Sequence, residues 1–213
     1  MISPRPVFKS TVVPLLGYVV VVAVLLWQAP RYGELWVPLY RWEIGILAPE
    51  LNVTELKVAT LQGERVVMLD VEARAGSVFG DYFFERAVPM TSSTLLGHVL
   101  LHPIVMLLIV LAWPKASTKC KLVYALTAIP FLVIVELLDV PLVLLGSLQD
   151  LVLANTAPNF NRFAPMVAWM DLLNGGGRIA LSVSAALLAI ATVQTLAPCP
   201  RAPASKQKLG SVV

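Results

Sequence analysis

Four long apolar blocks are the feature that most constrains how this chain can fold. Their cores run from Thr11 to Ala29, from Thr94 to Trp113, from Leu122 to Leu145 and from Ile179 to Leu196. Each is close to the ~20 residues that an α-helix needs to cross the hydrocarbon layer of a bilayer. Because backbone groups in lipid must be hydrogen-bonded within their own segment, each block is predicted to be a transmembrane helix.

The predicted fold class is therefore an all-α membrane bundle of four transmembrane helices, with a small extracytoplasmic α+β segment between the first two. The composition agrees, because 58% of the residues are hydrophobic and 14% are charged, against about 45–50% and about 25% in soluble domains. The predicted spans, with their flanks, are 1–29, 91–113, 122–145 and 179–197. The remaining segments are the outer segment 30–90, the inner loop 114–121, the outer loop 146–178 and the inner tail 198–213.

Basic residues beside these blocks predict the orientation. Cytoplasmic loops carry an excess of lysine and arginine, and three segments here have basic residues and no acid: Arg5 and Lys9 in the N-terminus, Lys115, Lys119 and Lys121 in the loop 114–121, and Arg201, Lys206 and Lys208 in the tail. No small-residue cleavage site follows the first block, so it is predicted to be an uncleaved signal anchor. We expect a multi-pass protein of the bacterial inner membrane with both termini in the cytoplasm.

The net charge of +3 has the same topological explanation. A nucleic-acid-binding protein would carry a basic stripe interleaved with aromatic residues, and the sequence has none. We therefore expect no nucleic-acid partner.

The outer segment begins with an expected amphipathic helix. Leu35, Leu39, Trp42 and Ile46 recur at helical spacing, with Trp36 close by. Tryptophan is enriched at membrane boundaries, so this helix could lie in the membrane interface. Alternatively, it packs on the core of the outer segment itself.

A β-hairpin is predicted to follow. Residues 53–61 and 65–74 alternate β-branched with polar side chains around a short turn that contains Gly63. Val67, Leu69, Val71 and Ala73 would form its apolar face. An isolated hairpin is marginal in water, so this one needs a partner in the chain or outside it.

The second outer loop contains an expected short amphipathic helix over 165–173, followed by three glycines. Gly175, Gly176 and Gly177 could form a backbone nest that binds an anion or contacts a partner, with Arg178 beside it. The alternative is a tight bend between an interfacial helix and the last span.

Four ionisable residues lie within the predicted spans. His98 and His102 are four residues apart on the second span, and Glu136 and Asp139 are three apart on the third. Each pair shares one helix face, and a helical hairpin would bring all four to a similar depth. Such a set could bind a divalent transition metal, relay protons, or form a structural polar cluster. We expect no resident cofactor, with a divalent transition metal as the alternative.

Nothing in the sequence matches a common catalytic motif such as GxSxG, HExxH, Walker A or GxGxxG. The layout, however, resembles the exosortase H-associated membrane proteins, through LWVPLYRWEIGILAPELNVTELKVATLQGERVVMLDVEARAG followed by TSSTLLGHVLLHPIVMLLIV. The resemblance implies an accessory role beside a membrane transpeptidase that sorts envelope proteins, with the catalytic residues in the partner.

The sequence therefore favours a non-enzymatic accessory or assembly subunit of an envelope complex, in contact with the bilayer and with a larger integral membrane protein. One alternative is a metal- or haem-binding subunit of an oxidoreductase that uses the His/carboxylate set. Another is a small transporter or channel subunit.

Overall fold

The structure is a computed structural model that describes residues 7–114, 116–156 and 164–196, with the backbone alone at 7–16, 118 and 156. Along the chain, the elements are α1 (Val7–Trp27), α2 (Ala29–Leu47), β1 (Leu51–Leu61), β2 (Glu64–Ala73), β3 (Ser77–Phe79), β4 (Tyr82–Phe84), β5 (Val88–Leu95), α3 (Leu96–Ala112), α4 (Thr118–Thr156), α5 (Pro165–Leu172), the π-helical turn η1 (Leu173–Gly177) and α6 (Arg178–Leu196).

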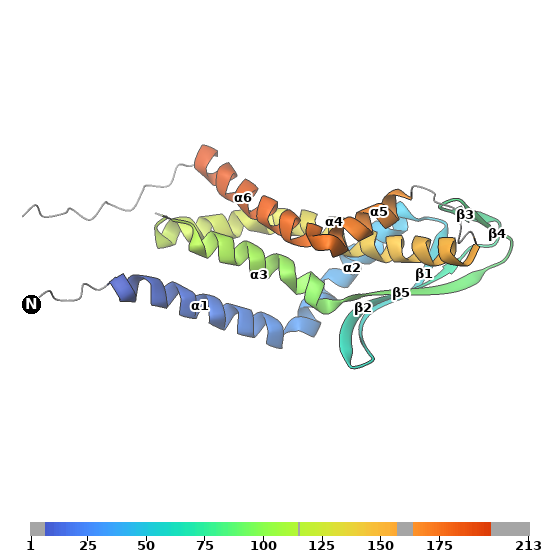
Figure 1. Cartoon of the computed structure of the whole chain (residues 1–213), viewed down its shortest axis with the longest axis horizontal. Coiled ribbons are helices and arrows are strands. Elements are labelled where there is room, and N and C mark those ends of the chain that lie inside the picture. The colour runs from blue at the N-terminus through green and yellow to red at the C-terminus, as the bar shows by residue number, and fades with distance from the viewer. Residues whose placement is uncertain (1–6, 115, 157–163, 197–213) are drawn as a thin grey trace, which may run out of the picture.

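The molecule is elongated, with helices at one end and the sheet at the other (Figure 1). The helices α1, α3, α6 and the first half of α4 occupy the helical end. The second half of α4 continues past them and packs against the strands, together with α2. The start of α1, the α3–α4 connection and the end of α6 all lie at the end away from the sheet.

The prediction of a bundle of four transmembrane helices is wrong. Among the described residues, two helical stretches are long and apolar enough to cross a membrane, Lys119–Asn155 with 37 residues and Pro165–Leu196 with 32. The apolar helices Gly17–Trp27 and Leu96–Ala112 are shorter. The two long stretches allow a membrane protein by their length and composition, and the rest of the fold includes a three-stranded antiparallel sheet.

The predicted second span fails because its first residues form a strand. Residues 91–95 belong to β5, which pairs antiparallel with β2. Ser92 and Thr94 are buried, and the Ser92 hydroxyl donates a hydrogen bond to the Leu144 carbonyl of α4. This stretch is polar and contains two β-branched threonines, which favour a strand. The helix α3 therefore begins only at Leu96 and has 17 residues.

The predicted third and fourth spans also have other boundaries. The helix α4 has 39 residues and continues for eleven residues beyond Leu145. The expected separate helix over 165–173 is α5, which η1 joins to α6 in one interrupted helical stretch.

The expected hairpin is present as β1 and β2, and it forms part of a larger sheet. The strand order is β1-β2-β5, with Leu61 opposite Glu64 across the turn. Gln62 and Gly63 both have positive φ, as a two-residue hairpin turn of type I′ requires. The predicted apolar face is buried: Val67, Leu69, Val71 and Ala73 are at most 2% exposed. A second, short hairpin of β3 and β4 was not predicted.

The sheet is covered by two helices. One face of α4 presents Val140, Leu144, Leu148 and Val152 at intervals of four residues, as helical periodicity requires. The helix α2 buries Trp36, Tyr40 and Ile44 in the same core and leaves its other face outside. The expected amphipathic helix therefore packs on the core of the outer segment, but through a different face from the one predicted.

Several predictions concern residues that lie outside the described ranges. They include the basic residues of the N-terminus and tail, one lysine of the inner loop, the tail itself and most of the irregular stretch after α4; by position these are Arg5, Lys115, Arg201, Lys206, Lys208, 198–213 and 157–163. The side chain of Lys9 is likewise not described.

Candidate functional site

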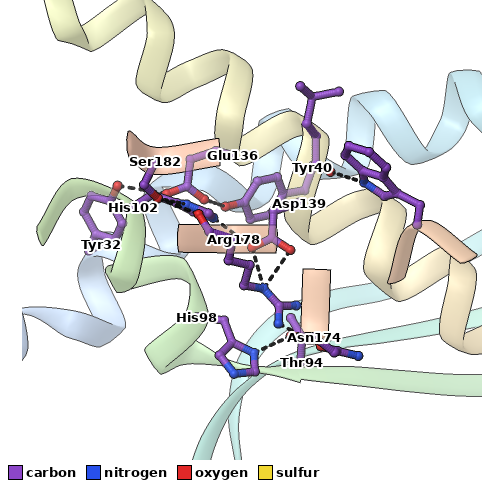
Figure 2. A network of polar contacts seen from close by, with 12 residues as sticks. Tyr32, Tyr40, Thr94, His98, His102, Glu136, Asp139, Asn174, Arg178 and Ser182 are labelled. Carbon is purple, nitrogen blue, oxygen red and sulfur yellow. Dashed lines mark hydrogen bonds and ion pairs between the residues drawn. The ribbon is translucent and has the colours of Figure 1, made fainter. Parts of the chain in front are cut away.

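A network of buried polar side chains joins α3, α4 and α6 (Figure 2). At its centre is Asp139 of α4, which is fully buried. The Nε atom of Arg178, from α6, donates to both carboxylate oxygens of Asp139 at 2.9 and 2.8 Å. His102 of α3 contacts the same carboxylate through Nε2 at 2.8 Å. One carboxylate therefore ties three helices together.

The other ring nitrogen of His102 contacts α6. His102 Nδ1 lies 2.8 Å from Ser182 Oγ, and the Ser182 hydroxyl donates to the Arg178 carbonyl at 2.8 Å, one turn earlier in the helix. The ring therefore bridges Asp139 of α4 and Ser182 of α6 through its two nitrogens.

This arrangement has the residue types of a Ser-His-Asp triad but not its chemistry. A hydrolase histidine must accept the serine proton on a free lone pair. Here Ser182 is fully buried, and its hydroxyl donates to the Arg178 carbonyl instead. The contacts therefore favour a structural role for the three residues.

Glu136 is bound by two tyrosines of α2. Tyr32 and Tyr40 donate their phenolic protons to Oε1 at 3.1 Å and to Oε2 at 2.5 Å, respectively. Burial and the nearby Glu136 carboxyl raise the pKa of both phenols well above the usual range, so they stay protonated as donors. Glu136 thus connects α2 to α4, one helical turn from Asp139.

The structure separates the four predicted ligands. His102 and Asp139 are in contact, whereas Glu136 bonds the tyrosines and His98 is only half-buried, with its Nδ1 3.4 Å from Thr94 Oγ1. Among the residues that the structure describes, no three His, Cys, Asp or Glu side chains are grouped so as to hold a metal ion. Asp139 already accepts hydrogen bonds from the Arg178 cation. Binding of a divalent transition metal remains an untested prediction.

The three glycines form the bend between α5 and α6. Gly176 has φ 110°, and a Cβ added to Gly177 would lie 2.7 Å from the Leu172 carbonyl oxygen. Arg178 turns inward to Asp139, and its Nη1 donates to the Asn174 side chain at 2.7 Å. Arg178 Nη2 is buried without a partner in the described part of the chain. The Arg178 side chain therefore serves the buried network, and anion or partner binding at the glycines remains an untested prediction.

Sequence reasoning missed several members of the network. Ser182 and Asn174 lie four residues on either side of Arg178, so helical spacing could have grouped them with it. No comparable signal points to Tyr32 and Tyr40, which lie 104 and 96 residues from Glu136.

Outside the network, Glu43 of α2 should make stability depend on pH. Burial raises its pKa to about 7, and its Oε2 is buried without a hydrogen-bond partner among the described residues. Because the folded-state pKa lies above the ordinary 4.5, ionisation opposes folding. This penalty is absent at low pH, grows between about pH 4.5 and 7, and is constant above.

Glu43→Gln should therefore raise the free energy of unfolding at pH 8 by about 1–2 kcal/mol, a value discounted for partial exposure, and change it little at pH 4.5. Chemical unfolding in detergent at the two pH values measures this difference. The exposed Glu34→Gln on the same helix is the control. An equal gain at both pH values would contradict the assignment.

Searches against family models, curated proteins and solved structures found no match to this chain. The resemblance to exosortase-associated proteins thus remains a prediction.

Proposed function

We propose that this protein is a non-enzymatic accessory subunit of a bacterial inner-membrane envelope complex, and that it binds a larger integral membrane protein through the outer face of α2. The observation that carries the proposal is the exposure of that face. Leu35, Trp42 and Ile46 are 72%, 59% and 58% exposed, although the opposite face of the helix is buried in the core.

The spacing of these side chains suits a helix-binding partner. Leu35, Trp42 and Ile46 stand at i, i+7 and i+11, with the half-buried Leu39 at i+4. An apolar stripe of this kind is how amphipathic helices enter a partner's groove. Contiguous exposed apolar surface usually marks an interaction site in water, and exposed tryptophans are frequent hot spots.

We place the sheet and α2 on the extracytoplasmic side and both termini in the cytoplasm, in a multi-pass arrangement. The start of α1, the α3–α4 connection and the end of α6 gather at the end away from the sheet (Figure 1). The sequence around these points is basic and free of acids, which fits the positive-inside rule.

The buried network supports a structural rather than a transporting or redox role. A transporter or a metal- or haem-binding subunit would direct its polar groups toward a pathway or an ion. Here the central groups bond mainly to one another and fix α2, α3, α4 and α6 in place. An accessory role would also agree with what the family resemblance implies.

Trp42→Glu should weaken partner binding by about 30-fold or more, because the loss of a central aromatic residue commonly costs at least 2 kcal/mol. The measurement is the ratio of co-purifying integral membrane protein to bait, after mild solubilisation of cells that express the tagged chain. Phe83→Glu is the matched control, since Phe83 of β4 is also an aromatic residue and is 53% exposed.

The proposal predicts a stoichiometric partner with the wild type and with Phe83→Glu, and its loss with Trp42→Glu. Isolation of the wild type as a lone species, or equal retention in both variants, would overturn it. A photocrosslinking residue at position 42 should then label the same partner.

A further inference from the structure

A groove opens where the helical end meets the sheet. It measures about 350 Å³ and lies between the α1–α2 junction, the end of the β1–β2 hairpin and the β5–α3 junction. Figure 1 shows the hairpin turn extending beside the start of α3. Under the proposed membrane placement, this is the level of the lipid headgroups on the outer side.

The walls of the groove are apolar. Of the leucines that line it, Leu96 and Leu100 of α3 are buried, whereas Leu26 and Leu95 are 55% and 37% exposed. Leu26 belongs to α1, whose exposed valines and leucines would face lipid. The groove therefore continues an apolar surface that is suited to an acyl chain.

The rim of the groove carries one charge of each sign. Glu64 and Arg65, at the start of β2, line it and are both exposed. Neither side chain has a hydrogen-bond or ion-pair partner within the described residues. A cation and an anion without partners among the described residues therefore lie at the groove and are available to an occupant.

We propose that this groove binds one phospholipid with a zwitterionic, amine-bearing headgroup of the ethanolamine type. Arg65 contacts the phosphate, Glu64 accepts hydrogen bonds from the primary ammonium, and one acyl chain lies along Leu26 and Leu100. Guanidinium–phosphate and carboxylate–ammonium pairs are charge-assisted hydrogen bonds. The inference rests on the membrane placement in the proposed function and not on the partner.

Gly97 provides a direct way to block the groove. It lines the groove on α3, and a Cβ at this position would meet no atom within 4 Å. A Cβ is therefore tolerated there, so Gly97→Leu should occupy part of the groove, and leucine favours a helix more than glycine does. Gly17→Leu is the matched control, since Gly17 of α1 is exposed and also open.

The test is native mass spectrometry of the full chain in detergent, titrated separately with phosphatidylethanolamine, phosphatidylcholine and phosphatidylglycerol. We expect one tightly bound phosphatidylethanolamine on the wild type and on Gly17→Leu, and about tenfold weaker binding on Gly97→Leu. Arg65→Gln should weaken binding of all three lipids. Glu64→Gln should remove the preference over phosphatidylglycerol, because it eliminates the repulsion of an anionic headgroup.

Equal binding of the three lipids by the wild type, or unchanged binding by Gly97→Leu, would overturn the proposal and leave ordinary annular lipid as the explanation. Because Arg65 is on the exposed hairpin, its variant keeps the test decisive if Gly97→Leu folds poorly. Glu55→Gln on the same hairpin, outside the groove, controls for general charge effects. Trp42→Glu should leave lipid binding intact, which separates this inference from partner binding.

Discussion

Arg178→Met should lower the free energy of unfolding by about 3–5 kcal/mol, the range for breaking a buried ion pair by removing one partner. The variant leaves the Asp139 carboxylate buried, with the His102 ring as its remaining side-chain contact. Methionine roughly matches the apolar part of arginine, so most of the loss comes from the uncompensated charge and not from a cavity.

The double variant Arg178→Met/Asp139→Leu should recover most of this stability, because it removes both charges and restores apolar packing. Chemical unfolding of purified protein in detergent measures both effects, with the exposed Arg86→Met as a control that should change by less than about 0.5 kcal/mol. A loss below about 1 kcal/mol for the single variant, or no recovery in the double, would show that the pair does not hold the helices together.

The second large effect is expected at Gly146, where α4 lies close against α5. A Cβ on Gly146 would lie 2.6 Å from the Met166 carbonyl oxygen and 3.0 Å from Met170 Cβ. Backbone atoms cannot swing aside, so Gly146→Ala must push α5 outward. The shift also strains the hydrogen bond from Trp169 Nε1 to the Leu138 carbonyl, which is 2.7 Å long.

We expect Gly146→Ala to cost about 3 kcal/mol, at the upper end of overpacking effects. Gly33→Ala should cost less, since its nearest atoms are the side-chain ends of Leu96 and Val58, which can move. Gly45→Ala, on an open face of α2, should stabilise by about 0.5–1 kcal/mol. Thermal unfolding of the three variants gives the ranking, and a harmless Gly146→Ala would mean that the two helices pack less tightly than described.

The parts of the fold that sequence reasoning predicted are those encoded by neighbouring residues. The β1–β2 hairpin and its buried face from Val67 to Ala73 follow from alternation over a short window. The residues at which the apolar helices begin and end could not be predicted from neighbouring residues. Thr91 to Leu95 adjoin an apolar run and were absorbed into it, although pairing with β2, which is distant in sequence, makes them a strand.

The candidate site divides in the same way. Spacing placed His102 and Asp139 on facing helices at similar depth, and they are in contact. Arg178 was grouped with the glycines beside it, because nothing local indicates that its side chain turns toward α4. The tyrosines required knowledge that α2 packs against α4, which is a tertiary fact with no local pattern.

The long helix α4 has a consequence for the order in which the protein folds during synthesis. The three strands of the sheet leave the ribosome before α4, and residues 140–152, which cover part of their apolar face, emerge at least 45 residues after Leu95 ends β5. Until then α2 alone can cover this face, and the part that α4 covers stays exposed, which is the condition under which partly made chains aggregate. Completion of the sheet's core is therefore tied to the emergence of α4, and a chain truncated before residue 140 should be recognised by the cell's quality control rather than accumulate as a folded domain.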